Sequence, residues 1–217
     1  VPLPGGGRGE RIMTPIWKER TYENPVCCFG SKPLCKIRWS GRRGRCPAQS
    51  LVKDGVDARV IMPLYGDLKM RDKLEYVTNY SVPVGWRSQY CGLFKAEVNG
   101  VTYYFLDNEY YFKRRGLYGF YDDGERFAFF SRAVLETLFY IDFTPDIINC
   151  NDWQTALVPV YLNLYYRHLD KFNRIKTIFT IHNIAYQAST APISWRIPAA
   201  SATATSTLWN TMAAPTL

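Results

Sequence analysis

Residues 145–183, PDIINCNDWQTALVPVYLNLYYRHLDKFNRIKTIFTIHN, decide the fold of this chain. The apolar runs at 146–150 and 175–181 have the length of buried strands, and 153–166 between them is long enough for a helix. Strand, helix and strand in this order form a βαβ unit, whose two strands are parallel and whose connection is right-handed. The stretch therefore predicts an α/β fold built on a Rossmann-like parallel sheet.

Polar residues follow both of these predicted strands. Asp152 comes just after the first strand, and His182 and Asn183 come just after the second. Doubly wound folds bind their ligands at the carboxyl ends of parallel strands. Imidazole, carboxamide and carboxylate groups can all hydrogen-bond the hydroxyls of a sugar. Structural roles stay open beside this one, since Asp152 could cap the following helix and His182 could simply pack.

Other stretches agree with an α/β domain. The run ARVIMPLYG at 58–66 predicts a buried strand closed by Pro and Gly, and Asn99-Gly100 between two β-rich runs predicts a hairpin. The stretch at 122–140 has acidic residues in its first turn and predicts a helix. Its apolar residues at helical spacing are Phe127, Phe130, Val134 and Leu138.

Charge divides the chain of 217 residues into three parts. The net charge is +8, yet Lys and Arg outnumber Asp and Glu by ten to three in 1–50 and balance them at sixteen each in 51–187. Residues 188–217 are rich in Ala, Ser, Thr and Pro and carry one charge, Arg196. We therefore expect a basic segment of doubtful fold at 1–50, a folded domain at 51–187 and an unstructured tail at 188–217.

The basic segment raises two further hypotheses. Trp39 lies among Arg38, Arg42, Arg43 and Arg45, a pattern typical of a nucleic-acid-binding patch. A nucleic-acid-binding protein is therefore the rival functional class. Runs of like charge are, however, most often only solvated. The four cysteines of this segment lack the paired C-x2-C spacing of a zinc site. We expect no metal, no cofactor, no nucleic acid and no membrane span, and the sequence leaves the oligomeric state open.

Three stretches resemble the bacterial glycogen synthase and plant starch synthase family. They are LYGFYDDGERFAFFSRAVLE at 117–136, PDIINCNDWQTALVPVYL at 145–162 and IKTIFTIHNIAYQ at 175–187, with weaker support from 54–66 and 104–114. The resemblance covers nearly all of 51–187 and implies the N-terminal Rossmann-like domain of a two-domain (GT-B) glycosyltransferase. The implied activity is transfer of glucose from ADP-glucose to an α-1,4-glucan, with retention, in the cytoplasm of a bacterium or, alternatively, in a plastid.

The resemblance also implies site residues. Asp152 and His182 match catalytic positions that line the glucosyl subsite, and Asn183 matches a substrate-binding neighbour. Asn108, Tyr111 and Gln187 are the other substrate-binding residues that it implies. The family often has His at the positions of Asn149 and Asn151, so this chain departs mildly from the pattern there.

The family's Lys-x-Gly-Gly-Leu motif, whose Lys contacts the diphosphate, is missing, and KIRWSG stands at 36–41. One possible coding of KIRWSG gives Lys-Ser-Gly-Gly-Leu when its first nucleotide is dropped, and the neighbouring frame of 188–199 gives a family-like continuation. We therefore hypothesise that 1–50 and 188–217 are read out of frame around an in-frame core. Such a chain would be inactive or weakly active, or would bind glucan without catalysis.

Overall fold

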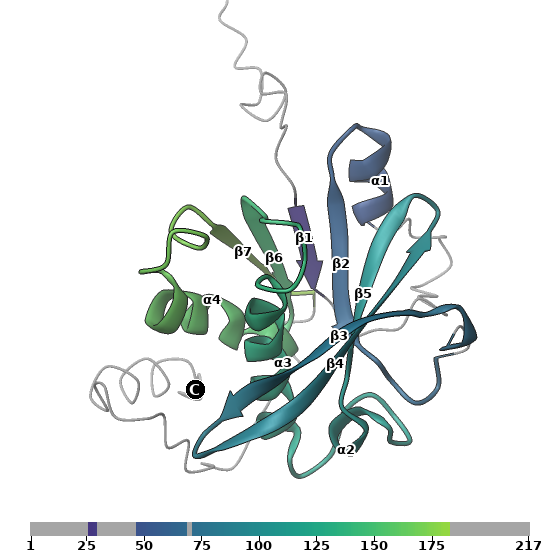
Figure 1. Cartoon of the computed structure of the whole chain (residues 1–217), viewed down its shortest axis with the longest axis vertical. Coiled ribbons are helices and arrows are strands. Elements are labelled where there is room, and N and C mark those ends of the chain that lie inside the picture. Colours follow the sequence, from purple (N-terminus) through teal and green to yellow (C-terminus); the bar gives the residue numbers. More distant parts are fainter. Residues whose placement is uncertain (1–25, 30–46, 69–70, 183–217) are drawn as a thin grey trace, which may run out of the picture.

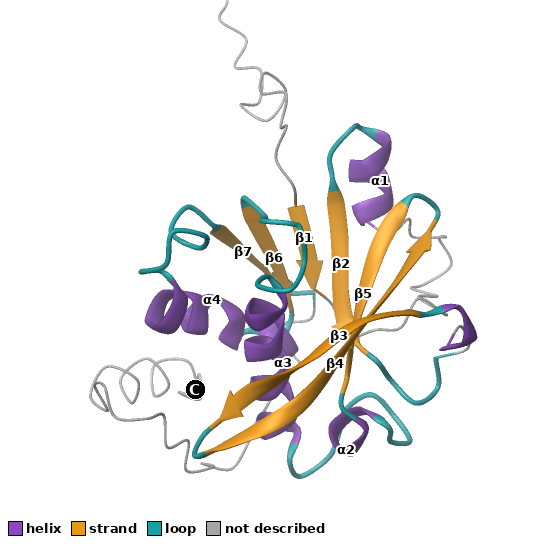
Figure 2. Cartoon of the chain, viewed as in Figure 1, coloured by secondary structure: helices purple, strands orange, loops and turns teal. Residues whose placement is uncertain are grey.

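The computed structural model describes residues 26–29, 47–68 and 71–182, which form one mixed sheet with helices on its faces (Figures 1 and 2). The strands are β1 (Val26–Phe29), β2 (Ala58–Pro63), β3 (Glu75–Val84), β4 (Arg87–Val98), β5 (Val101–Asp107), β6 (Ile147–Asn151) and β7 (Lys176–Thr180). The α-helices are α1 (Pro47–Lys53), α2 (Glu109–Phe112), α3 (Asp123–Thr137) and α4 (Leu157–Tyr161). Short 3-10 or π segments are η2 (Arg71–Lys73), η3 (Trp153–Thr155) and η4 (Leu162–Tyr166).

The strands are ordered β3-β4-β5-β2-β1-β6-β7. The five strands from β5 to β7 in this order pair in parallel, and β3 and β4 extend the sheet as antiparallel strands. The predicted α/β class and parallel sheet are confirmed. The parallel arrangement brings the carboxyl ends of β5, β2, β1, β6 and β7 to one edge of the sheet.

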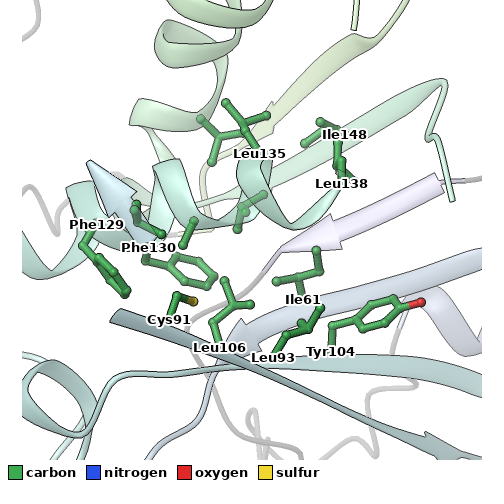
Figure 3. Packing of buried hydrophobic residues seen from close by; sticks show 14 of the residues in the cluster. Ile61, Cys91, Leu93, Tyr104, Leu106, Phe129, Phe130, Leu135, Leu138 and Ile148 are labelled. Atoms are coloured by element: carbon green, nitrogen blue, oxygen red, sulfur yellow. The ribbon is translucent and has the colours of Figure 1, made fainter. Parts of the chain in front are cut away.

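Side chains of β2 and β5 alternate between two hydrophobic cores. Ile61 and Leu106 lie in the larger core with α3, whereas Met62 and Phe105 lie in a smaller core with Ala48 of α1. This is the period of two that a strand covered on both faces must show. In the larger core, Phe129 and Phe130 of α3 pack over strand residues that include Cys91 and Leu106 (Figure 3). Burial of the two described thiols, Cys91 and Cys150, raises their pKa to about 12.

The predicted hairpin and the predicted helix are both present. Asn99 and Gly100 have φ of 52° and 76° and join β4 to β5 in a two-residue turn, which explains why the turn needs an Asn-Gly pair. Helix α3 carries Asp123 and Glu125 in its first turn, where the helix dipole favours negative charge. Its four predicted core residues are buried: Phe127, Phe130, Val134 and Leu138.

The segment predicted as one helix at 153–166 is helical but not regular. It runs as the 3-10 turn η3, then α4, then the π segment η4. Pro159 lies inside it, and proline cannot donate the backbone hydrogen bond that a regular helix requires. The sequence pattern predicted the length of the helical segment correctly, but it did not predict these changes in hydrogen bonding.

Residues 1–50 differ from the expectation in two places. Strand β1, the apolar run VCCF, lies between β2 and β6 near the middle of the sheet, and α1 begins at Pro47, before the expected boundary. The sheet therefore includes a strand from the segment that was expected to be of doubtful fold. Four apolar or small residues between Pro25 and Gly30 can form a short parallel strand, and the charge of the surrounding segment obscured this signal.

Candidate functional site

The candidate site lies where β6 and β7 end side by side. These strands pair in parallel, with Asn149 opposite Ile178 and Asn151 opposite Thr180. One residue beyond the ladder, the backbone N–H of Asp152 donates to the carbonyl of Thr180 at 2.9 Å. The chain after β6 is thereby tied to the last residue of β7, and the residues that follow both strands meet at one edge of the sheet.

Asp152 and His182 are in direct contact at this edge. The backbone N–H of His182 donates to Oδ1 of Asp152 at 2.8 Å. The Asp152 side chain makes no capping hydrogen bond to the short helix η3 that follows it. The helix-capping role that the sequence left open is therefore wrong, and the carboxylate faces His182 instead.

The backbone of Asp152 is held in an unfavourable conformation. Its φ of 58° and ψ of −179° fall in a region that is essentially reserved for glycine. Such a residue costs about 1–3 kcal/mol and persists only where the surrounding structure enforces it. Here the bonds to Thr180 and His182 hold both sides of the residue. The strained backbone directs a carboxylate toward the edge of the sheet. A glycine would adopt this conformation without strain but would supply no carboxylate.

We expect Asp152→Gly to be more stable than Asp152→Ala by about 1 kcal/mol or more. Both variants lose the carboxylate, so the comparison isolates the backbone. Glycine accepts φ of 58° without strain, whereas in ordinary strand or helix positions alanine is the more stable of the two by about 0.5–1 kcal/mol. Urea unfolding of both variants measures the difference. An alanine variant as stable as the glycine variant would show that Asp152 is not strained.

A polar network that the sequence did not predict surrounds this pair. Asn151 Oδ1 lies 2.9 Å from His182 Nε2, and Thr180 Oγ1 donates to Asn149 Oδ1 at 3.1 Å. The hydroxyl of Thr155 donates to the carbonyls of Asn151 and Asp152 at 2.9 and 3.2 Å. The sequence held one signal for this network. Side chains alternate between the two faces of a strand, so Asn149 and Asn151 lie on the same face of β6.

Trp153 anchors the chain that leaves the site. Its ring packs edge-on against Phe127 of α3, with centroids 4.9 Å apart, and against Tyr118 at 6.2 Å. The next residue, Gln154, is 4% exposed and does not face solvent. The turn that carries Asp152 is therefore fixed on one side by β7 and on the other by the core under α3.

Asn108 and Tyr111 lie close to each other but apart from the Asp152–His182 pair. Asn108 caps α2, since its Oδ1 accepts from the Tyr111 N–H at 3.1 Å and its Nδ2 donates to the Tyr90 carbonyl at 2.8 Å. Tyr111 is fully buried, and its hydroxyl donates to the Glu125 carboxylate, which also pairs with Arg87. Burial and this carboxylate raise the pKa of Tyr111.

The strand order explains this separation. Asn108 follows β5, and β5 is three strands from β6 in the sheet. Neighbouring strands are about 4.8 Å apart, so the two strand ends lie about 14 Å from each other along one edge. Asn108 thus borders the same edge as Asp152, whereas the buried Tyr111 would need to move to touch a ligand.

Several predicted features lie outside the described residues. They include Asn183, Gln187 and the whole Arg-rich patch around Trp39. Within 26–29, 47–68 and 71–182, no group of three or more His, Cys, Asp or Glu side chains is arranged to hold a metal ion. None of the helices in these ranges is long and apolar enough to cross a membrane.

The fold and this edge define the chain as a Rossmann-like α/β domain with a polar candidate site at its strand ends. Residues 45–211 match the family described as starch synthase catalytic domain. The chain belongs to this family, whose members are glycosyltransferases. The match begins inside the expected basic segment and extends past Gln187 into the expected tail.

The relatives are glycogen synthases and a starch synthase. The chain is 57% identical to glycogen synthase of Caldicellulosiruptor bescii over 61% of this chain and 28% of the relative, and 54% identical to that of Clostridium acetobutylicum over 72% and 34%. Among solved structures, the catalytic domain of starch synthase IV from Arabidopsis thaliana, bound to ADP and acarbose, matches with a TM-score of 0.65 and 28% identity. That match covers 76% of this chain and 35% of the other. The chain spans about a third of the length of these relatives.

Proposed function

We propose that this chain forms the acceptor-side domain of an enzyme that transfers glucose from ADP-glucose to an α-1,4-glucan. The observation that carries the proposal is the Asp152–His182 pair at the carboxyl edge of β6 and β7, held there by a strained backbone. Strain of this kind gathers at functional sites, because ordinary packing gives no reason to keep it. The ADP and acarbose bound to the starch synthase IV domain support a nucleotide sugar and a glucan as the ligands.

In this proposal the residues hold a glucosyl unit and stabilise its transition state. Transfer with retention passes through an oxocarbenium-like state with a departing diphosphate. Asp152 favours the developing positive charge, and His182 and Asn183 hydrogen-bond sugar hydroxyls. Asn108 borders the same edge, Gln187 is a further substrate-binding residue of the proposal, and the buried Tyr111 would contact substrate only after it moved. The reaction needs no cofactor, and a bacterial cytoplasm is the compartment that we propose.

The chain by itself is expected to transfer little or no glucose. It lacks the Lys-x-Gly-Gly-Leu motif that would contact the diphosphate, and it spans about a third of its relatives. Incubation of the purified chain with labelled ADP-glucose and glycogen should leave the glycogen with little or no label. A full-length glycogen synthase assayed in parallel is the positive control. Robust incorporation by the chain would overturn this prediction.

We also propose that the amino acids of 1–50 and 188–217 reflect frame changes around an in-frame core. The support is the shifted coding of 36–41, which gives a lysine-glycine-glycine motif in the place where the family has one. Resequencing of the coding DNA decides the question. A single unbroken frame, with peptides that span 36–60 identified by mass spectrometry, would contradict the proposal.

A further inference from the structure

Two of the hydrogen bonds of the Asn151 side chain define the orientation of its amide. Its Nδ2 donates to the backbone carbonyl of Asn149 at 3.4 Å, and its Oδ1 lies 2.9 Å from His182 Nε2. A carbonyl oxygen can only accept a hydrogen bond, so the group that faces Asn149 must be the NH2 of the amide. The oxygen of the amide therefore faces His182.

This orientation fixes the proton on the imidazole. Because Asn151 Oδ1 can only accept, the hydrogen bond at 2.9 Å requires a hydrogen on Nε2 of His182. We propose that Asn151 is a positioning residue that holds neutral His182 in the tautomer protonated on Nε2. The lone pair is then on Nδ1.

Backbone N–H groups of the neighbouring residues hold the segment of chain that carries the ring. The N–H of His182 donates to Asp152 Oδ1, and the N–H of Asp152 donates to the carbonyl of Thr180. Asn151 is itself the last residue of β6 and pairs with Thr180 of β7. The amide of Asn151, which hydrogen-bonds the imidazole, and the backbone that carries the imidazole are thus joined by one set of hydrogen bonds.

The tautomer decides which sugar groups His182 can recognise. This step rests on the proposed function, whereas the tautomer itself does not. With its hydrogen directed at Asn151, the ring has only an acceptor, Nδ1, to offer a ligand. It can take the hydrogen of a sugar hydroxyl but cannot donate one. Neutral His182 therefore selects a ligand hydroxyl that acts as donor at this point.

Nitrogen-15 NMR of the imidazoles tests the proposal directly, since the chain has two histidines, His168 and His182. Protonated and bare ring nitrogens have well-separated resonances, and His168→Gln assigns the two rings. At mildly alkaline pH we expect His182 in the Nε2–H form, with the exposed His168 averaging between tautomers. A hydrogen bond of ordinary net strength shifts the ratio of the two tautomers about fivefold.

Matched variants separate positioning from folding. Asn151→Ala should move the His182 resonances toward the averaged values of His168, whereas Asn151→Asp retains an acceptor and should keep the Nε2–H form. Asn173→Ala, on the exposed loop before β7, is the asparagine control and should change nothing. An Nδ1–H form of His182 in the unmodified chain would overturn the proposal. An Asn151→Ala variant whose His182 resonances equal those of the unmodified chain would also overturn it. Neither outcome depends on glucose transfer, so the proposed function can fail separately.

Discussion

We expect Arg126→Ala to lower the free energy of unfolding by about 3–5 kcal/mol. Arg126 lies in α3 and is fully buried, and its guanidinium forms an ion pair with Asp123 one turn earlier. Its Nε also donates to the Tyr111 carbonyl at 2.7 Å. Removal of the guanidinium leaves the 7%-exposed Asp123 without this countercharge and leaves the carbonyl without its donor.

The same network holds the loop before α3. Asp123 Oδ2 accepts from the backbone N–H groups of Gly119 and Phe120 at 2.5 and 3.1 Å. Urea unfolding measures the effect, and Arg115→Ala, which removes an exposed arginine from the same loop, should change stability by no more than about 0.5 kcal/mol. A loss below about 1 kcal/mol for Arg126→Ala would mean that water or a rearranged loop replaces the pair.

Phe130→Ala should cost about 3–5 kcal/mol by a different mechanism. The Phe130 ring is fully buried in the core between α3 and the sheet (Figure 3). It meets Phe112 edge to face, with ring centroids 6.4 Å apart. Truncation removes apolar burial and leaves a cavity that the surrounding rings cannot fully close. Tyr121→Ala is the control, because that side chain is 90% exposed. Equal losses in the two variants would contradict this description of the core.

The sequence predicted the βαβ unit and α3 because each has a strong local signal. Ile148 and Cys150 of β6 are buried, and the four apolar residues predicted on α3 all point into the core. The Asn99-Gly100 turn was equally clear, since it needs positive φ at both positions. Where local preference and tertiary packing agree, the pattern is sufficient.

The missed elements have weak or masked local signals. Strand β1 is only four residues long and lies in a segment whose charge dominates its composition. The β3–β4 hairpin turns at Gly85, with φ of 59°, and Trp86, a Gly-X turn whose local signal is weaker than that of Asn-Gly. Strand β1 owes its place in the sheet to pairing with the distant strands β2 and β6, which no local pattern reports, whereas β3 and β4 pair with strands that are adjacent in sequence.

The candidate site was only partly predictable. The sequence correctly predicted that Asp152 and His182 lie together, because each follows one of two neighbouring parallel strands. It could not show the strained φ of Asp152 or the contact of Asn151 with the imidazole, because both depend on the exact geometry of the turn after β6. Tyr111 matched a family position, yet its burial depends on packing against α3.

Binding of the glucosyl donor at the edge formed by Asp152 and His182 underlies the proposed function. Titration of the nitrogen-15-labelled chain with ADP-glucose, followed by backbone NMR, tests this binding. We predict saturable shifts at Asn151, Asp152 and His182 that are lost in Asp152→Ala, with the resonances around Tyr121 unchanged. Shifts confined to other parts of the chain, or no shift at these three residues at the highest soluble concentration of ADP-glucose, would contradict the claim.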